Sequence, residues 1–258
     1  MTDAVFIPEG ERFLPTELAR GPWDPAAQHG GAPAGLLARA LEGVAPADGM
    51  HVARMTVEFL RPVPLEPLQV TAELLRPGRR VQLVGARLSA GGAEVCRATA
   101  LRIRRADGAA PPTAPEAPPP GPDETEPSQF PGRFLERSFG GTAVEQRFAS
   151  GSWELGPAVV WMRLAVPPVA GEEPSGLVRT MAAADFGNGV SRTLDWDEYV
   201  FINPDLTAYL ERPLEGEWVC LDARTSVDGA GIGLAESALY DTRGRIGRAV
   251  QALYVGGR

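Results

Sequence analysis

The sequence predicts an α+β fold in which a helix, followed by a meander of antiparallel strands, occurs twice in tandem. Three observations lead to this prediction. The stretch 196–255 divides into extended segments separated by turn-forming breaks, a helical pattern precedes it, and the same order of segments occurs about 151 residues earlier. Together these observations predict two copies of the same helix-and-sheet unit.

The later copy has the clearer pattern. Between Trp196 and Val255, four segments mix β-branched, aromatic and small apolar residues, and breaks rich in Gly, Pro and Asp separate them, which is typical of an antiparallel meander. Apolar residues at helical spacing run from Val178 towards Asp185, and Gly187 is a predicted helix stop. One helix followed by four long strands is the order of elements in a hot-dog fold, where the sheet wraps around the helix.

The earlier copy repeats this order. The segment from Met55 to Ile103 can be laid over the later meander at a spacing near 151 residues, and Arg61-Pro62 then meets Arg212-Pro213. A helical stripe ahead of it predicts the first helix, and its members are Leu36, Leu37, Ala40, Leu41 and Val44. The predicted architecture is a double hot-dog, with two tandem copies of a helix wrapped by an antiparallel β-sheet.

The predicted domains follow from the repeat and from a proline-rich segment between the copies. Residues 1–105 form an N-terminal hot-dog, in which residues 1–23 supply a first strand, and residues 131–258 form a C-terminal hot-dog. Residues 106–130 are the linker. Proline is so dense between Ala106 and Pro127 that we expect no regular element there.

Composition narrows the class of protein. The 258 residues carry a net charge of −8 and a pI near 5.0, which argues against nucleic acid or an anionic membrane as the main partner. Cys96 and Cys220 stand far apart, which favours buried thiols in a reducing cytoplasm over a disulfide. The N-terminus lacks a signal-peptide pattern, and no run of apolar residues is long enough to span a membrane. We expect a cytoplasmic protein.

Three polar residues of the later copy occupy positions where a buried pattern calls for apolar ones. Asp185 falls in line with the apolar helical stripe, where an unpaired carboxylate is costly. Asn203 corresponds to Val52 of the earlier copy, and Gln251 corresponds to Ala100. Three polar groups from three elements are thus predicted to converge.

Structural explanations compete with this interpretation. Asp185 can bond the loop 187–189 near its helix end, Asn203 precedes Pro204 as a turn residue does, and Gln251 can face solvent from its strand. The joint placement of the three residues favours a functional role, because independent accidents do not place them together.

The later half resembles the C-terminal hot-dog of the type II acyl-CoA thioesterases. MAAADFGNGVS resembles the segment with the catalytic Asp of that family, which maps to Asp185, and RAVQALYV resembles the strand with its catalytic Gln, which maps to Gln251. FINPDLTAYLERP resembles the strand with its catalytic Thr, a position held here by Asn203. In the earlier half, HGGAPAGLLARAL resembles a helix start with the sequence GGQ, and VEFLRP resembles a strand ending in Leu-Arg-Pro.

This resemblance implies hydrolysis of a fatty or other acyl-CoA by direct attack of a positioned water. Asp185 would accept the proton of the water while Asn203 and Gln251 orient it, with no metal and no organic cofactor. Open N–H groups at Gly30 and Gly31 are candidates for polarising the thioester carbonyl. We expect the acyl pocket to involve Trp161, Met181, Phe186 and Phe201. The family also implies a homodimer or a higher homo-oligomer.

Two alternatives remain open. Asp24 and His29 are five residues apart just before the first helix, the separation found in hot-dog enoyl-CoA hydratases, although the residues between them lack the order of that motif. A non-catalytic acyl-CoA or lipid-binding module is the second alternative, with Arg76, Arg79 and Arg80 as candidates to hold the phosphates of CoA. The convergent carboxylate favours the thioesterase, since a pure binder has no need of it.

Overall fold

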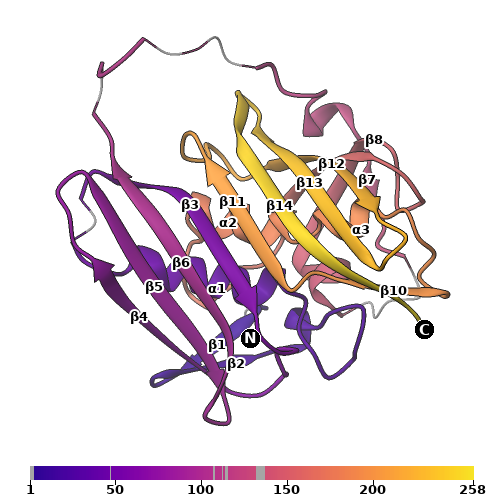
Figure 1. Cartoon of the computed structure of the whole chain (residues 1–258), viewed down its shortest axis with the longest axis horizontal. Helices are drawn as coiled ribbons and strands as arrows, with labels where there is room; N and C mark the ends of the chain where they lie inside the picture. The colour runs from indigo at the N-terminus through magenta and orange to yellow at the C-terminus, as the bar shows by residue number, and fades with distance from the viewer. Residues whose placement is uncertain (1–2, 47, 107, 112, 114–115, 132–136) are drawn as a thin grey trace.

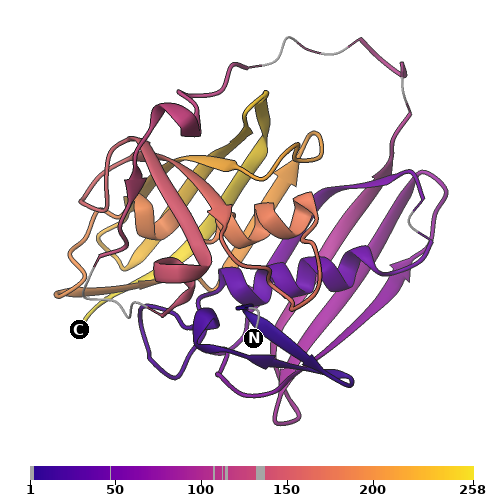
Figure 2. The same cartoon turned by 180° about the vertical axis from the view of Figure 1, so that it is seen from behind.

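A computed structural model describes residues 3–46, 48–106, 108–111, 113, 116–131 and 137–258. Within them, one antiparallel sheet of fourteen strands is backed by helices (Figures 1 and 2). The α-helices are α1 Gly31–Glu42, α2 Gly176–Ala184 and α3 Gly187–Val190, and other helical turns are η1 Glu17–Ala19, η2 Pro122–Glu124 and η3 Phe139–Ala143. The strands are β1 Phe6–Glu9, β2 Arg12–Pro15, β3 Met50–Phe59, β4 Leu68–Arg76, β5 Val81–Ala90, β6 Ala93–Arg104, β7 Pro127–Ser128, β8 Val144–Ser150, β9 Ala158–Leu164, β10 Tyr199–Ile202, β11 Asp205–Leu210, β12 Val219–Val227, β13 Ile232–Asp241 and β14 Gly244–Gly257.

The repeat is visible in the strand positions. Strands β4, β5 and β6 begin at residues 68, 81 and 93, and strands β12, β13 and β14 begin at residues 219, 232 and 244, so each later strand starts 151 residues after its counterpart. In each copy a helix lies against the concave side of its strands (Figure 2). The predicted double hot-dog is confirmed.

The two copies share one sheet because β3 pairs with β11. The strand order is β1-β2-β4-β5-β6-β3-β11-β14-β13-β12-β9-β8-β7, with β10 also paired to β14. Across the join Thr56 lies opposite Thr207, and the hydroxyl of Thr207 donates to that of Thr56 at 3.1 Å. The predicted domain boundaries stay predictions, and residues 107, 112, 114–115 and 132–136 near them lie outside the described residues.

The two main helices pack against each other through small residues. A Cβ atom at Gly35 of α1 would lie 3.7 Å from Ala182 Cβ and from Val178 Cγ1 of α2, which is ordinary van der Waals contact. At Gly31 a Cβ atom would lie only 2.5 Å from the carbonyl oxygen of Ala182, so this position needs glycine. The beginning of α1 is thereby held close to the end of α2.

The predicted first strand of the later meander is divided in two. Strand β10 ends at Ile202 and β11 begins at Asp205, because Pro204 has no N–H with which to continue the ladder. The interruption is satisfied locally, since the carbonyl of Pro204 accepts from the N–H of Phe59 at 2.8 Å and Asn203 Nδ2 donates to the carbonyl of Asp205 at 3.2 Å. Asn203 therefore occupies a break between two strands.

Gly187 begins a helix where the sequence predicted a stop. Helix α2 ends with Asp185 as its C-cap, and α3 follows from Gly187. A Cβ atom at residue 187 would lie 2.7 Å from Ser237 Oγ and 3.1 Å from Gln251 Oε1. Glycine at this position allows the helix to lie directly against the sheet.

The proline-rich segment contains regular structure, which corrects the expectation of none. It includes the turn η2 and leads into β7, and hydrogen bonds join its later part, from Glu116 onwards, to the later copy. Trp161 Nε1 donates to the carbonyl of Pro120 at 2.7 Å, and Tyr240 Oη donates to Glu116 at 2.6 Å. The acceptor is a backbone carbonyl in the first bond and the Glu116 carboxylate in the second, and both donors come from the outer face of the sheet.

The N-terminal region also differs from its prediction. Residues 1–23 were expected to supply one strand, but the chain forms the hairpin β1–β2 and the turn η1, with Gly10 at a φ of 59° between the two strands. Residues 1–2 lie outside the described residues. A left-handed turn residue at position 10 lets the short strands reverse direction.

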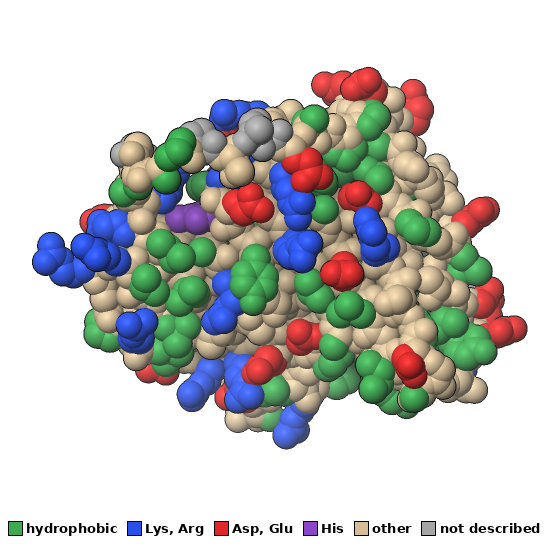
Figure 3. Space-filling model, turned by 45° about the horizontal axis from the view of Figure 1, so that its top comes forward, with side chains coloured by type: hydrophobic (Ala, Val, Ile, Leu, Met, Phe, Trp, Pro, Cys, Tyr) green, Lys and Arg blue, Asp and Glu red, His purple; other side chains and the backbone are tan. Residues whose placement is uncertain are grey.

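The cysteines are buried, as the sequence predicted. Figure 3 shows acidic and basic side chains interspersed over the middle of one face. Cys96 and Cys220 are free and buried, and burial raises the pKa of both thiols. No helix in the described part of the chain is long and apolar enough to cross a membrane.

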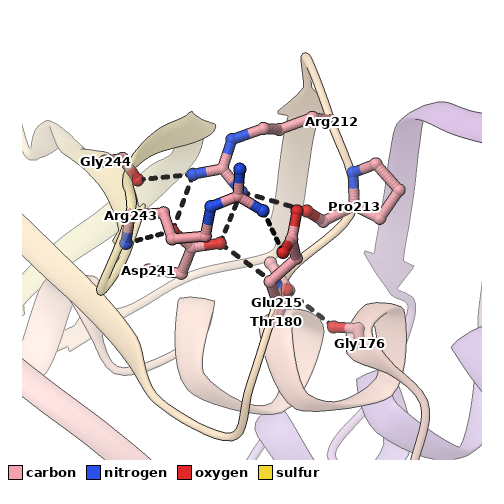
Figure 4. A network of polar contacts seen from close by, with 8 residues as sticks. All are labelled: Gly176, Thr180, Arg212, Pro213, Glu215, Asp241, Arg243 and Gly244. Carbon is pink, nitrogen blue, oxygen red and sulfur yellow. Dashed lines mark hydrogen bonds and ion pairs between the residues drawn. The ribbon is translucent and has the colours of Figure 1, made fainter. Parts of the chain in front are cut away.

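A buried ion pair ties the end of β13 to the loop after β11 (Figure 4). Asp241, whose side chain is fully buried, accepts from two nitrogens of Arg212 and from the backbone N–H groups of Glu215 and Arg243. Burial raises the pKa of Asp241, but these hydrogen bonds outweigh it and hold the pKa below its usual range.

We expect Asp241→Asn to lower the free energy of unfolding by about 1–3 kcal/mol at pH 7, because the variant loses the charge of a fully buried carboxylate that pairs with Arg212, whose side chain is 30% exposed. The pKa of Asp241 is lower in the folded protein than in the unfolded chain, where it is about 4. The ion pair therefore stabilises the protein at pH values above the unfolded pKa, and this stabilisation is lost as the pH falls through the folded pKa. Urea denaturation of both proteins should show the difference shrinking below about pH 4. Asp228→Asn, in an exposed turn where Asn keeps the bond to Ala230, is the control; an equal loss in both variants would contradict the role of the pair.

Candidate functional site

Asp185 stands at the centre of a polar cluster at the end of α2. Its Oδ1 accepts from Asn203 Nδ2 at 2.9 Å and faces Gln251 Nε2 at 3.4 Å, while its Oδ2 lies 3.0 Å from His29 Nδ1. The residue is 7% exposed. The structure thus brings the three polar residues singled out from the sequence together and adds a histidine from the other copy.

The first helix begins directly opposite this carboxylate. Gly30, the N-cap of α1, is so close that a Cβ atom there would lie 2.7 Å from Asp185 Oδ2 and 2.9 Å from Phe59 Cζ. The backbone of Gly30 has a φ of −59°, which any residue can adopt, so the contact alone requires glycine. The positive end of the α1 dipole faces the carboxylate as a result.

His29 Nδ1 faces one hydrogen-bond acceptor and one hydrogen-bond donor. It lies 3.0 Å from Asp185 Oδ2, to which it can only donate while that carboxylate is ionised, and 3.0 Å from the N–H of Gly31, from which it can only accept. The proton on this nitrogen therefore decides which neighbour is bonded. The ring is fixed between them by Phe186, whose centroid is 4.3 Å away.

Gln251 lies behind the carboxylate. The side chain is 2% exposed, and its Oε1 accepts from the backbone N–H of Asn188 at 3.0 Å while its Nε2 faces both the carbonyl oxygen and Oδ1 of Asp185 at 3.4 Å. The strand β14 therefore holds the end of α2 and the start of α3 through one amide. In this position Gln251 can fix Asp185 but is not at the cavity surface.

A cavity of about 690 Å³ opens in front of Asp185. Of the site residues predicted from the sequence, Asp185, Asn203, Gly30 and Phe186 line it. Gly31 and Phe201 lie behind its wall: Gly31 packs on Phe139 and Ala182, and Phe201 is 2% exposed. The residues that complete the lining are Gly21, Pro22, Trp23, Asp24, Ala27, Gln28, His29, Phe59, Leu60, Arg61, Pro62, Val63, Phe130, Trp153, Asn188, Gly189, Trp196, Val200, Ile202, Pro204, Tyr254 and Arg258.

Sequence reasoning missed two groups of this lining. Asn188, which donates through Nδ2 to the carbonyl of Phe201 at 3.1 Å, was grouped only with a loop. The tryptophans Trp23, Trp153 and Trp196 come from irregular segments, where no periodicity predicts which way a side chain points. Trp161, expected in the acyl pocket, instead packs on the outer face of the sheet with Cys220. Alternation along β9 turns it away from the helix.

The hydratase pair does not form in the described residues. Asp24 Oδ1 accepts from the N–H of Ala26 at 2.8 Å and so closes its own turn, while His29 is engaged by Asp185. A group of three or more His, Cys, Asp and Glu side chains able to hold a metal ion is not found in the part of the chain that the structure describes.

The opposite ends of α1 and α2 meet in a related way but with different chemistry. There Glu42, the last residue of α1, accepts from Ser175 Oγ, the N-cap of α2, at 2.5 Å beside a smaller cavity of about 290 Å³. Val52 lines that cavity and Ala100 is buried, at the positions equivalent to Asn203 and Gln251. Only one of the two meeting points carries the pair of amides.

Two family models match the chain. The acyl-CoA thioesterase N-terminal domain matches residues 19–103, and the acyl-CoA thioesterase C-terminal domain matches residues 96–255. This chain belongs to the acyl-CoA thioesterase family. The protein is therefore a thioester hydrolase, which favours an enzyme over the non-catalytic binding module.

Solved structures share the fold of the thioesterase. A candidate thioesterase II of Thermobifida fusca superposes with a TM-score of 0.74 at 20% identity, covering 97% of this chain and 95% of the other. An acyl-CoA thioesterase II of Mycobacterium marinum gives 0.64 at 17% identity, with 97% and 93% covered, and a tesB protein of Mycobacterium avium subspecies paratuberculosis gives 0.65 at 15%, with 97% and 96% covered. A comparison with curated proteins finds no match.

The close approach of Gly30 to Asp185 yields a prediction. We expect Gly30→Ala to lower kcat/KM for an acyl-CoA on the order of 100-fold, since its methyl group must displace the carboxylate or Phe59. Gly43→Ala, at the other end of α1 with its nearest neighbour at 3.5 Å, is the matched control and should keep its activity. Thermal unfolding of both variants separates a displaced carboxylate from a misfolded protein. Full activity of a folded Gly30→Ala variant would show that the close contact is not needed for activity.

Proposed function

We propose that the thioesterase hydrolyses an acyl-CoA to a free acid and CoA by direct attack of a water bound at Asp185. One observation carries the proposal: a nearly buried carboxylate, fixed by Asn203 and Gln251, borders a large cavity at the start of a helix. A thioester needs no covalent catalyst beyond this, because a positioned water, a proton acceptor and donors at the developing oxyanion suffice.

Asp185 and Asn203 would bind the attacking water together. Nδ2 of Asn203 is engaged by Asp185 and by the carbonyl of Asp205, so the amide oxygen is left to accept from a water in the cavity that Asn203 lines. Asp185 would accept the other proton as the water attacks. Asn203 holds the position that the resemblance assigns to a Thr, and its amide oxygen would supply the acceptor for the water.

Gln251 acts as a positioning residue in this proposal. Its contacts at 3.4 Å to the carbonyl and carboxylate oxygens of Asp185 hold the end of α2, and its Oε1 holds α3. The role differs from the sequence-based expectation that Gln251 orients the water, since the side chain lies behind Asp185.

The start of α1 would stabilise the oxyanion. Gly30 borders the cavity, and its N–H belongs to the first turn, where helix N–H groups have no partner within the helix. The N–H of Gly31, the second candidate from the sequence, is directed at His29 Nδ1. His29 contacts the carboxylate of Asp185 and the start of α1, so it would help to position both the proton acceptor and the oxyanion site.

Removing the carboxylate tests the mechanism. We expect Asp185→Asn to lower kcat for hydrolysis of an acyl-CoA by roughly 100-fold or more, since Asn cannot accept the proton of the water. Release of CoA followed with a thiol reagent is the measurement. Asp222→Asn, on β12 and remote from the cavity, is the control. Hydrolysis by Asp185→Asn at the rate of the control would exclude Asp185 as the proton acceptor. If the unchanged protein hydrated a 2-enoyl-CoA and released no CoA, the hydratase alternative would be favoured.

Two arginines at the cavity are suited to the phosphates of CoA. Arg61 and Arg258 line it, and Arg61 has no ion-pair partner among the described residues. Arg76, Arg79 and Arg80, the candidates from the sequence, belong to the hairpin between β4 and β5 and are not among the lining residues. The cavity therefore offers its own cations for the nucleotide end of the substrate.

We expect Arg61→Ala to raise KM for acyl-CoA roughly 5-fold with little change in kcat, and to weaken the dependence of KM on salt. Initial rates at two ionic strengths measure both effects, and Arg79→Ala is the matched control on the distant hairpin. Equal KM values for the two variants would place the phosphates elsewhere.

The homo-oligomer and the cytoplasmic location expected from the sequence stay predictions.

A further inference from the structure

The tryptophans of this protein are concentrated at one cavity. The chain has five, and Trp23, Trp153 and Trp196 line the cavity in front of Asp185. Trp161 and Trp218 belong to a separate cluster on the outer face of the sheet. The cavity wall is completed by further rings, and those rings are Phe59, Phe130, Phe186 and Tyr254. The lining also contains aliphatic side chains larger than alanine, and they are Leu60, Val63, Val200 and Ile202 with the prolines Pro22, Pro62 and Pro204.

The rings on each side of the cavity are fixed by ring contacts. Trp23, Trp196 and Phe201 form a trio in which each pair of centroids is 4.9 Å apart. On the other side Phe130 meets Trp153 edge to face at 4.8 Å. Tilted and edge-to-face pairs at these distances are favourable and hold the rings in place. The two groups are therefore preformed surfaces and need no rearrangement to receive a ligand.

Gly189 lies beside both groups. A Cβ atom on Gly189 would be 3.8 Å from Trp153 Cζ3 and 3.8 Å from Trp196 Cη2, so the position next to this glycine is in van der Waals contact with both tryptophans. Gly189 follows Asp185 by four residues, and both residues line the same cavity. A group placed at this position is within reach of a thioester held at Asp185.

We propose that the acyl group of the substrate carries an aromatic ring, which binds between Trp153 and Trp196, with one or two carbons between the ring and the thioester carbonyl. The inference rests on the proposed hydrolysis. Water adds to the carbonyl carbon, the C–S bond breaks, and the arylalkanoic acid leaves while the thiolate of CoA gains the proton. A flat ring can make ring contacts with the edges of the two indoles that a flexible alkyl chain cannot make, and the chain loses more rotamer entropy on binding.

Two substrates with eight acyl carbons test the inference. We expect kcat/KM for phenylacetyl-CoA to exceed that for octanoyl-CoA by about 10-fold, and Trp153→Leu to reduce this ratio roughly 3- to 10-fold. Trp218→Leu, which removes an outer-face indole beside Arg147 and Arg163, should leave the ratio unchanged. Gly189→Val keeps both tryptophans and fills the space between them, so it should reduce the ratio even if Trp153→Leu fails to fold.

Binding of analogues that cannot be hydrolysed separates this inference from the proposed function. In S-(2-oxo-3-phenylpropyl)-CoA and S-(2-oxononyl)-CoA a methylene group follows the sulfur, so calorimetry reports affinity alone. Preference for the phenyl analogue without hydrolysis of either thioester would support the aromatic site and overturn the proposed hydrolysis. Hydrolysis with equal or better kcat/KM for octanoyl-CoA, together with equal affinities of the analogues, would overturn the aromatic site and leave the hydrolysis standing.

Discussion

The site depends on one close contact, in which the start of α1 lies against the end of α2. Because Gly30 has no side chain, the backbone of α1 can approach the carboxylate of Asp185. A Cβ atom at Gly30 would come within 2.7 Å of Asp185, and one at Gly31 within 2.5 Å of the carbonyl of Ala182. This approach places the positive end of a helix from one copy at the carboxylate of the other. The shared sheet, joined through β3 and β11, fixes the two helices at that separation.

The duplicated fold creates two such meeting points, and sequence differences make them unlike. At the Asp185 end Asn203 interrupts a strand and Gln251 supports the helix end from β14, so the buried carboxylate has its hydrogen bonds. At the other end the equivalent residues are Val52 and Ala100, and Glu42 is paired with a serine hydroxyl. An isolated buried carboxylate is costly, which explains why the amides accompany Asp185 and are absent where it is absent.

The cost of a buried polar site is offset by the surrounding packing. Gln251 is bonded at both ends of its amide, and Asn203 closes the strand break that Pro204 opens. Asp185 is 7% exposed, and it borders a cavity of about 690 Å³ whose lining contains many aromatic rings. Rigid support behind the reacting group and an apolar cavity in front of it are what water-mediated thioester hydrolysis requires.

The sequence by itself determined the repeat, the fold class and the convergence of Asp185, Asn203 and Gln251, because periodicity and a fixed offset between copies are local properties of the chain. Tertiary structure alone decided that His29 joins them, that Gln251 stands behind the carboxylate, and that three tryptophans line one cavity. His29 and Trp23 come from the earlier copy, whereas their neighbours Asp185 and Trp196 come from the later one. No pattern along the chain records which distant side chains meet, since loops lack a period and their directions are set by packing.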